Sequence, residues 1–154
     1  MKIKQILSIS IILILCFMLT SCVKIYNDEQ KFVDKLYDQQ LGKIEGLVLD
    51  LRTRGTKEKE DGTFAKSHIS GAKSFDVNQD TDLKSFMNKI AGKKTTIFIV
   101  DSGNEEYIQI VEELKELGYN KLVVYTGGYE YLRTTEAFIE AIYEGSGLDD
   151  CGCD

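Results

Sequence analysis

The chain has 154 residues, with 19 basic and 25 acidic side chains, a formal net charge of −6 at pH 7 and 43% hydrophobic residues. This length and composition suit one ordinary domain with enough apolar side chains for a core, which argues against a multidomain protein and a disordered chain. The acidic balance and the lack of a basic run argue against binding to nucleic acids, because these are polyanions.

The N-terminal residues have the pattern of an export signal. Lys2 and Lys4 supply positive charge, and residues 6–19 form an almost unbroken apolar run. A membrane-spanning helix needs about 20 apolar residues, whereas this run is shorter and ends in small polar residues. We therefore expect residues 1–21 to form a cleavable signal peptide.

The end of this segment, Leu19-Thr20-Ser21-Cys22, resembles the lipobox of bacterial lipoprotein precursors. The resemblance implies that Cys22 carries diacylglycerol and fatty acid such as palmitate, and that it becomes the first residue after cleavage. It also implies a protein anchored by lipid to the cell membrane and facing outside the cytoplasm. The alternatives are an ordinary secretory signal with a chance cysteine, or an uncleaved anchor.

The first predicted element after Cys22 is an amphipathic helix over Glu29–Gln40, reached through a linker-like segment. Apolar side chains at helical spacing are expected to face the core, namely Phe32, Val33, Leu36 and Tyr37. A short apolar run follows over Leu47–Leu51, and its length indicates a buried strand. Residues 22–43 are thus expected to hold the lipidated cysteine and a helix, and residues 44–145 the main domain.

Helices and strands alternate along the rest of the chain. The patterns predict helices over Asp82–Ile90, Glu105–Leu117 and Tyr129–Tyr143, and strands over Thr95–Val100 and Lys121–Tyr125. In the second of these helices the inward side chains are expected to be Ile108, Val111, Leu114 and Leu117. Strands separated by helices of this length favour an α/β domain with a central parallel sheet flanked by helices.

Several motifs in order resemble the rhodanese-like domain family, from about Leu47 to Leu132. Leu49-Asp50-Leu51-Arg52 is similar to the family's strand ending in Asp-x-Arg. Ser67-His68-Ile69-Ser70-Gly71-Ala72, preceded by Phe64, is similar to its Gly-His-Ile-Pro-Gly-Ala turn. Leu114–Tyr119, Leu122–Tyr125 and Gly127-Gly128-Tyr129 are similar to its final helix, strand and double-glycine turn.

The resemblance implies a site in the segment Val100-Asp101-Ser102-Gly103-Asn104-Glu105, between a strand and a helix. Active members of the family place a cysteine here, in a loop whose backbone N–H groups hold the transferred sulfur. In this alignment Val100 stands at the nucleophile and Glu105 at the loop arginine. Valine cannot act as a nucleophile, and a carboxylate repels thiosulfate, so we expect sulfurtransferase activity to be absent.

Two residues near this loop leave a choice between chemical and structural roles. If the alignment is shifted by one residue, Asp101 becomes a candidate nucleophile, although Asp101 or Ser102 capping a helix that begins near Asn104 is the favoured interpretation. His68 could carry a proton, but the family's matching histidine orders a turn, and this is again favoured. We interpret Asp50, Arg52 and His68 as the scaffold of the site.

The C-terminal residues 146–154 form an acidic tail that ends in Cys151-Gly152-Cys153-Asp154. Cys151 and Cys153 could form a strained, reducible disulfide, bind a soft metal, or have no function. Neighbouring aspartates disfavour the thiolates, which weakens a redox role. The predicted domain itself is expected to need no cofactor and no metal.

Two function classes follow from these observations. The first, which we favour, is a non-catalytic rhodanese-like module that binds another envelope protein or a small neutral or cationic ligand. The second is an enzyme, either a sulfurtransferase or a thiol-disulfide oxidoreductase, that uses Cys151 and Cys153.

Overall fold

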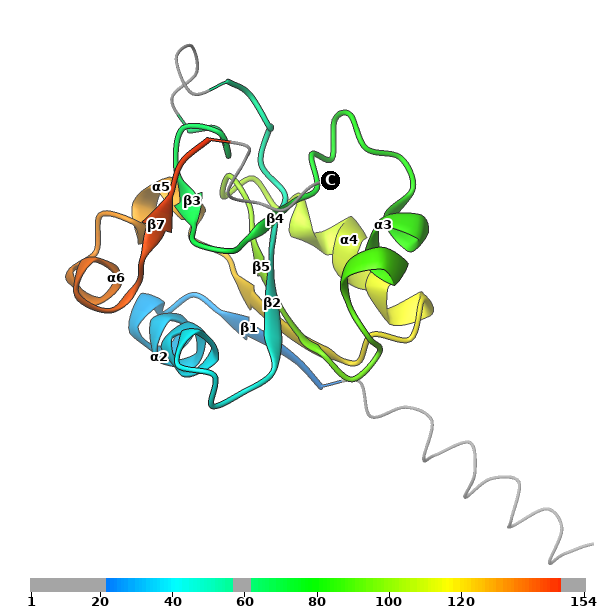
Figure 1. Ribbon diagram of the computed structural model, residues 1–154, viewed down its shortest axis with the longest axis horizontal. Coiled ribbons are helices and arrows are strands. Elements are labelled where there is room, and N and C mark those ends of the chain that lie inside the picture. The colour runs from blue at the N-terminus through cyan, green and yellow to red at the C-terminus, as the bar shows by residue number, and fades with distance from the viewer. Residues whose placement is uncertain (1–21, 57–61, 148–154) are drawn as a thin grey trace, which may run out of the picture.

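The computed structural model describes residues 22–56 and 62–147, and its centre is a five-stranded sheet (Figure 1). The strands lie in the order β1-β6-β5-β2-β4, and every neighbouring pair is parallel. Their bounds are Cys22–Tyr26 (β1), Gly46–Asp50 (β2), Lys73–Ser74 (β4), Thr96–Val100 (β5) and Lys121–Tyr125 (β6). The parallel sheet predicted from the sequence is thus confirmed.

Helices cover both faces of the sheet (Figure 1). One face packs against α2 (Glu29–Gln40), α5 (Tyr129–Leu132) and α6 (Glu136–Ala141), and the other against α3 (Leu83–Ile90) and α4 (Tyr107–Glu116). Alternate residues of each strand enter the two cores: Val48 and Phe98 face α2, whereas Ile97 and Ile99 face α3 and α4. This alternation follows from the two-residue repeat of a strand.

A short antiparallel pair lies beside the main sheet. It joins β3 (His68–Ile69) to β7 (Glu144–Gly145), so that the end of the described chain pairs with the histidine motif. Among the residues described, no helix is both long and apolar enough to cross a membrane.

The segment after Cys22 is a strand, not the linker that the sequence suggested. β1 extends the sheet at one edge, where Cys22 pairs in register with Lys121 and Tyr26 with Tyr125. The backbone N–H of Cys22 also donates to the carbonyl of Asn120 at 2.8 Å. Residues 22–43 therefore pack in the same layers as the rest of the domain.

The predicted helix over Tyr129–Tyr143 is wrong as a single element, because it breaks between α5 and α6. Thr134 and Thr135 turn their hydroxyls onto the carbonyls of Tyr131 and Leu132, at 2.8 and 2.7 Å. Thr135 then caps α6, since its hydroxyl accepts a hydrogen bond from the N–H of Phe138. Threonine side chains that bond locally in this way compete with the helix.

Two predicted core side chains are exposed. Ile108 is 49% exposed, and α4 faces the core through Ile110, Val111 and Leu114. Positions 108 and 110 lie about 200° apart on a helix, so only one of the two isoleucines can face the sheet. Tyr37 is 40% exposed for the same kind of reason, since it lies at the margin of the buried stripe of α2.

The carboxyl ends of the parallel strands lie together at one end of the sheet. Asp50 ends β2, Asp101 follows β5, and the Gly127-Gly128 turn follows β6. In open parallel sheets ligand sites form at this end. The fold therefore brings together the three motifs that the sequence analysis singled out.

Candidate functional site

A buried ion pair lies at the end of β2. Arg52 and Asp50 are both fully buried, and the guanidinium contacts the carboxylate through Nε at 3.0 Å and Nη2 at 2.8 Å. The backbone N–H of Arg52 donates to the same carboxylate at 3.0 Å. Two parallel bonds between a guanidinium and a carboxylate fix the orientation of both groups.

The guanidinium of Arg52 also joins three other parts of the chain. It donates to the carbonyls of Ser67 at 2.7 Å and Gly62 at 3.3 Å, and to the carboxylate of Glu130 at 3.0 Å. The ring of Tyr129 lies against its planar face, with 3.8 Å from Cζ to the ring centre. These contacts tie β2, the segment before β3 and α5 together around one cation.

Further charged groups extend this network toward β7. The Glu144 carboxylate accepts from the hydroxyl of Tyr129 at 2.6 Å and from Nε of Arg133 at 3.0 Å. Burial raises the pKa of the Tyr129 hydroxyl well above its usual range, and the hydrogen bond to Glu144 raises it further. Tyr129 therefore acts here as a neutral hydrogen-bond donor.

His68 is fully buried within the same region. Its Nδ1 lies 2.9 Å from the carbonyl of Phe64, so this nitrogen carries the proton, and its ring stacks on the Phe64 ring with 4.0 Å between centres. Its other nitrogen, Nε2, has no hydrogen-bond partner among the described residues. These are contacts that hold a turn in place.

The strand β5 delivers Val100 and Asp101 to different surroundings. The side chain of Val100 is fully buried in the core on the α2 side. Asp101, also fully buried, turns its carboxylate into the loop: Oδ1 accepts from the N–H of Gly103 at 2.8 Å and Oδ2 from that of Tyr107 at 3.4 Å. Backbone amides of the loop and of the start of α4 therefore bind the carboxylate of Asp101.

The carboxyl group of Asp101 is in an unfavourable setting for a charge. Burial raises its pKa above the usual range, hydrogen bonds from the backbone of Gly103, Tyr107 and Glu106 act in the opposite direction, and the Asp50 carboxylate raises it further. In contrast with Asp50, no side-chain cation is bonded to Asp101 among the described residues. In the described part of the chain, the partners of this carboxyl group are therefore backbone amides.

The loop is packed closely against the double-glycine turn after β6. A Cβ atom on Gly128, where φ is +79°, would lie 2.9 Å from the carbonyl oxygen of Ser102 and 3.0 Å from Gly103. The N–H of Tyr129 donates to the carbonyl of Asp101 at 2.9 Å. Glycine at position 128 therefore allows the two loops to touch and fixes the base of the loop.

The outer residues of the loop, 102–105, are exposed. Glu105 has φ of +67°, in the left-handed region of the backbone that residues other than glycine and asparagine rarely adopt. The helix α4 begins later than the sequence predicted, at Tyr107 instead of Glu105, and Glu106 precedes it. A carboxylate on a strained residue thus stands at the mouth of the loop.

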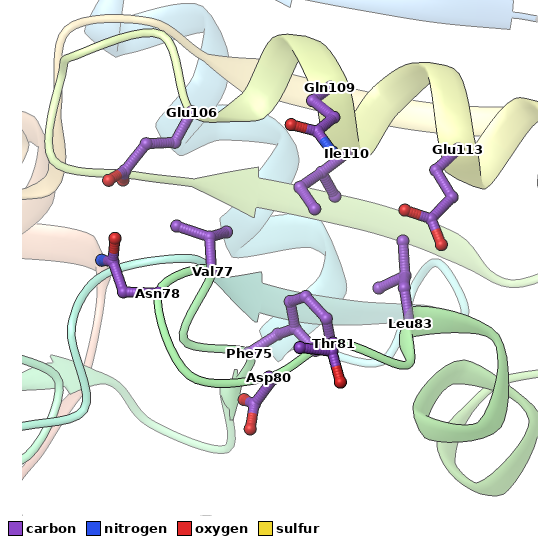
Figure 2. A pocket seen from close by; sticks show the side chains of 10 residues that line it. All are labelled: Phe75, Val77, Asn78, Asp80, Thr81, Leu83, Glu106, Gln109, Ile110 and Glu113. Atoms are coloured by element: carbon purple, nitrogen blue, oxygen red, sulfur yellow. The ribbon is translucent and has the colours of Figure 1, made fainter.

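A pocket of about 450 Å³ opens beside the loop, between α4 and the segment that leads into α3 (Figure 2). Its apolar lining comes from four side chains, namely Phe75, Val77, Leu83 and Ile110. Carboxylates of Glu106 and Glu113 border it, and one oxygen of Glu106 is buried without a partner in the described part of the chain. A third carboxylate, that of Asp80, already binds Arg54 at 2.5 Å.

The remaining predicted site residues lie elsewhere. Cys22 is exposed at the start of β1, at the amino ends of the parallel strands, whereas the loop lies at their carboxyl ends. Cys151 and Cys153 lie outside the described residues. In the ranges 22–56 and 62–147, no group of three histidine, cysteine, aspartate or glutamate side chains could hold a metal ion.

Sequence reasoning missed several members of the network. Glu130, Arg133 and Glu144 were not singled out, although Glu130 directly follows the Gly127-Gly128-Tyr129 motif. Asp76, which is buried and accepts from the N–H of Arg54 at 2.8 Å, was also missed. An isolated charge carries no local signal that it will be buried, so these partners emerge only from the tertiary fold.

The family model described as "Rhodanese-like domain" matches residues 32–134, more than half of the chain. The chain belongs to the rhodanese-like domain family. The match includes the Asp50–Arg52 pair, the loop after β5 and the double-glycine turn. No curated protein matches the chain.

Solved structures share the fold at low identity. The Alr3790 protein from Anabaena is 19% identical, with a TM-score of 0.55 over 75% of this chain and 91% of that one. The solution structure of the rhodanese-like domain from the same protein has a TM-score of 0.54 at 19% identity, over 79% of this chain and 82% of that one. A thiosulfate sulfurtransferase from Pseudomonas aeruginosa gives 0.57 at 16% identity, over 82% of this chain and only 21% of that enzyme.

Proposed function

We propose that this protein is a lipid-anchored lipoprotein of the cell envelope whose rhodanese-like domain is a binding module without sulfurtransferase activity. The observation that carries the second part is the place of the Asp101 carboxylate. It accepts hydrogen bonds from the backbone N–H groups of Gly103 in the loop and of Tyr107, the first residue of α4. In active members of the family such amides hold an anionic sulfur, and here an anion supplied by the chain already occupies them.

The charge around the loop favours the same conclusion. Glu105 is exposed at the mouth of the loop, and Glu106 directly precedes α4. These carboxylates disfavour an anion such as thiosulfate, because the repulsion between like charges is only partly screened near a protein surface. Val100, the residue aligned with the family's cysteine, lies in the core and carries no reactive atom.

The pocket between α4 and α3 is the binding surface that we propose for this module. Its apolar lining and the carboxylates of Glu106 and Glu113 suit a ligand with an apolar body and a positive end (Figure 2). A basic side chain of another envelope protein has this chemistry. The unpartnered oxygen of Glu106 supplies a hydrogen-bond acceptor for such a group.

The experiment that tests the loss of activity is a thiosulfate:cyanide sulfurtransferase assay on the protein. We expect no turnover for the natural chain, and turnover in a Val100→Cys, Glu105→Arg variant or in an Asp101→Cys, Glu105→Arg variant. The two variants also decide which residue stands at the nucleophile. Turnover by the natural chain would overturn the proposal, and its loss in a Cys151→Ser, Cys153→Ser variant would place the chemistry in the tail.

Ligand preference can be measured separately by NMR titration with phenethylamine, an apolar amine. We expect shifts at Gln109 and Ile110, which line the pocket, and their loss in a Glu106→Gln, Glu113→Gln variant. Glu112→Gln is the matched control, since Glu112 lies on α4 outside the pocket and pairs with Lys115. Tighter binding of thiosulfate than of the amine would contradict an acidic binding module.

The anchoring of the protein is tested by its intact mass. A lipoprotein purified from membranes has lost residues 1–21 and carries the added mass of diacylglycerol and fatty acid on Cys22. A Cys22→Ser variant should retain the signal segment and lose the lipid. An unmodified cysteine in the purified membrane protein would contradict this part of the proposal.

A further inference from the structure

Near Cys22, at the amino ends of β1, β6 and β5, the sheet face on the side of α2 forms an open groove. Because side chains alternate along a strand, matching residues of β1, β6 and β5 point to the side of α2: Cys22 and Lys24, Lys121 and Val123, Thr96 and Phe98. Together with Lys35 of α2 and Ile44, these side chains line a groove of about 310 Å³. The sulfur-bearing side chain of Cys22 therefore belongs to a defined surface.

Lysines dominate the charge of this surface. Lys24, Lys35 and Lys121 are exposed, and none of them has an ion-pair partner among the described residues. Glu45 precedes β2, and its carbonyl accepts from the N–H of Thr96 in the groove, but its carboxylate accepts from the hydroxyl of Thr95 at 3.1 Å. Three unpaired ammonium groups thus surround Cys22 in a protein whose net charge is negative.

The lysines lie at one end of the parallel strands. The strands run from Cys22 and Lys121 at their amino ends to Asp101 at the carboxyl end, where Glu105 is exposed. An anionic surface would attract the amino ends, since each lysine near such a surface contributes about 1 kcal/mol and the field decays within roughly 10 Å. The lysines therefore favour an orientation with the amino ends of the strands toward such a surface.

We propose that the surface formed by Lys24, Lys35 and Lys121 around Cys22 docks on the headgroups of anionic phospholipids. Docked in this way, the domain stands on the amino ends of its strands, and the loop after β5 and the acidic pocket face away from the membrane. This inference rests on the proposed lipidation of Cys22, which would hold the surface at the bilayer. Because β1 begins at Cys22 itself, no linker separates the lysine surface from the proposed lipid, and the surface must lie close to the bilayer.

Amine acetylation followed by mass spectrometry tests this proposal residue by residue. The lipoprotein purified from membranes is reconstituted into vesicles of phosphatidylcholine, or of phosphatidylcholine with phosphatidylglycerol. We expect Lys24, Lys35 and Lys121 to react about fivefold more slowly in the anionic vesicles, the ratio that 1 kcal/mol gives. Lys84, an exposed lysine of α3, should react at the same rate in both.

A charge reversal sharpens the same measurement. Lys24→Glu should reduce the protection of Lys35 and Lys121 in anionic vesicles, whereas Lys84→Glu, with the same change in net charge, should leave it intact. High salt should abolish the protection in the natural protein. Equal acetylation rates in the two vesicle types would overturn the proposal.

The failure of the anchor and the failure of the surface give different results. If intact mass shows no lipid on Cys22, the same protein is pelleted with each type of vesicle, and selective pelleting with phosphatidylglycerol would uphold the surface without the anchor. If Cys22 carries lipid and the three lysines remain unprotected, the anchor stands and the docking surface is wrong.

Discussion

Two buried aspartates end neighbouring strands of this domain, and their surroundings differ. Asp50, at the end of β2, is bonded to the guanidinium of Arg52, which itself bonds to Glu130 and two carbonyls. Among the described residues, Asp101, after β5, is hydrogen-bonded to the backbone N–H groups of Gly103 and Tyr107 and to no side chain. The first aspartate is neutralised by a cation, whereas the second fills a cradle of amides and has a raised pKa.

The difference teaches how one residue type can have two kinds of partner in the same fold. Asp50 is paired with a buried cation, and removing that partner would leave an unpaired buried ion, which costs several kcal/mol. Asp101 is bound by backbone amides, and under our proposal its carboxylate takes the place of the anionic group that active members of the family hold there.

The largest effect should come from breaking the first of these two sites. We expect Arg52→Met to destabilise the domain by about 3 to 5 kcal/mol, because Asp50 would remain buried without a cation. Urea denaturation measures this change. Arg133→Met is the control, since Arg133 is about one-third exposed and its loss should cost at most about 1 kcal/mol. Equal costs for the two variants would refute the scaffold role of Arg52.

The next effect concerns the support of the loop that holds Asp101. We expect Gly128→Ala to cost about 2 to 3 kcal/mol, because it combines an unfavourable positive φ with a Cβ that meets the carbonyl of Ser102. Gly118→Ala is a matched control, with φ of +87° and open space around the added atom. The same unfolding free energy for both variants would show that the loops do not need their close contact.

A smaller effect should appear in the pH dependence that Asp101 imposes. Its pKa is raised on folding, so the stability that it contributes is fully present below the unfolded value of 3.8 and is lost as pH rises through the folded value. An Asp101→Asn variant lacks this titration. The unfolding free energy of the natural chain should therefore fall relative to the variant across that window, as measured by denaturation at a series of pH values. A constant difference would show that Asp101 is not held at a cost.

The smallest effect should come from relieving the strained backbone at the loop mouth. We expect Glu105→Asn to stabilise the domain by up to about 1 kcal/mol, because asparagine tolerates the left-handed region. Thermal unfolding detects such a gain. Glu105→Ala removes the same carboxylate without relieving the backbone, so stabilisation of equal size in both variants would assign the effect to charge.

The elements that could be predicted are those with local signals. β2, β5 and β6 are short β-branched or leucine-rich runs, and α3 is capped by Asp82, whose carboxylate accepts from the N–H of Ser85 at 2.8 Å. The order of these elements was enough to predict the parallel sheet. β1 was missed, because its five residues directly follow an apolar segment that was interpreted as a signal.

The candidate site was only partly predictable for a related reason. The loop after β5 and the Asp50–Arg52 pair lie in continuous motifs, whereas Glu130 bonds to Arg52 from 78 residues away. Similarly, the choice between Ile108 and Ile110 depends on which helix face meets the sheet, and the sequence offers an isoleucine on each side. Features that depend on tertiary packing could not be predicted from the local sequence pattern.

The place of β1 in the sheet has a consequence for the order of folding. The first described strand pairs in parallel with β6, the last long strand, so nearly the whole domain separates the two partners in sequence. Contacts of such long range form slowly, because closing the chain between them costs entropy before any bond is gained. Until β6 is in place, the strand next to Cys22 has no edge to join. We therefore expect β1, the strand that contains Cys22, to join the sheet last, after the other strands have assembled.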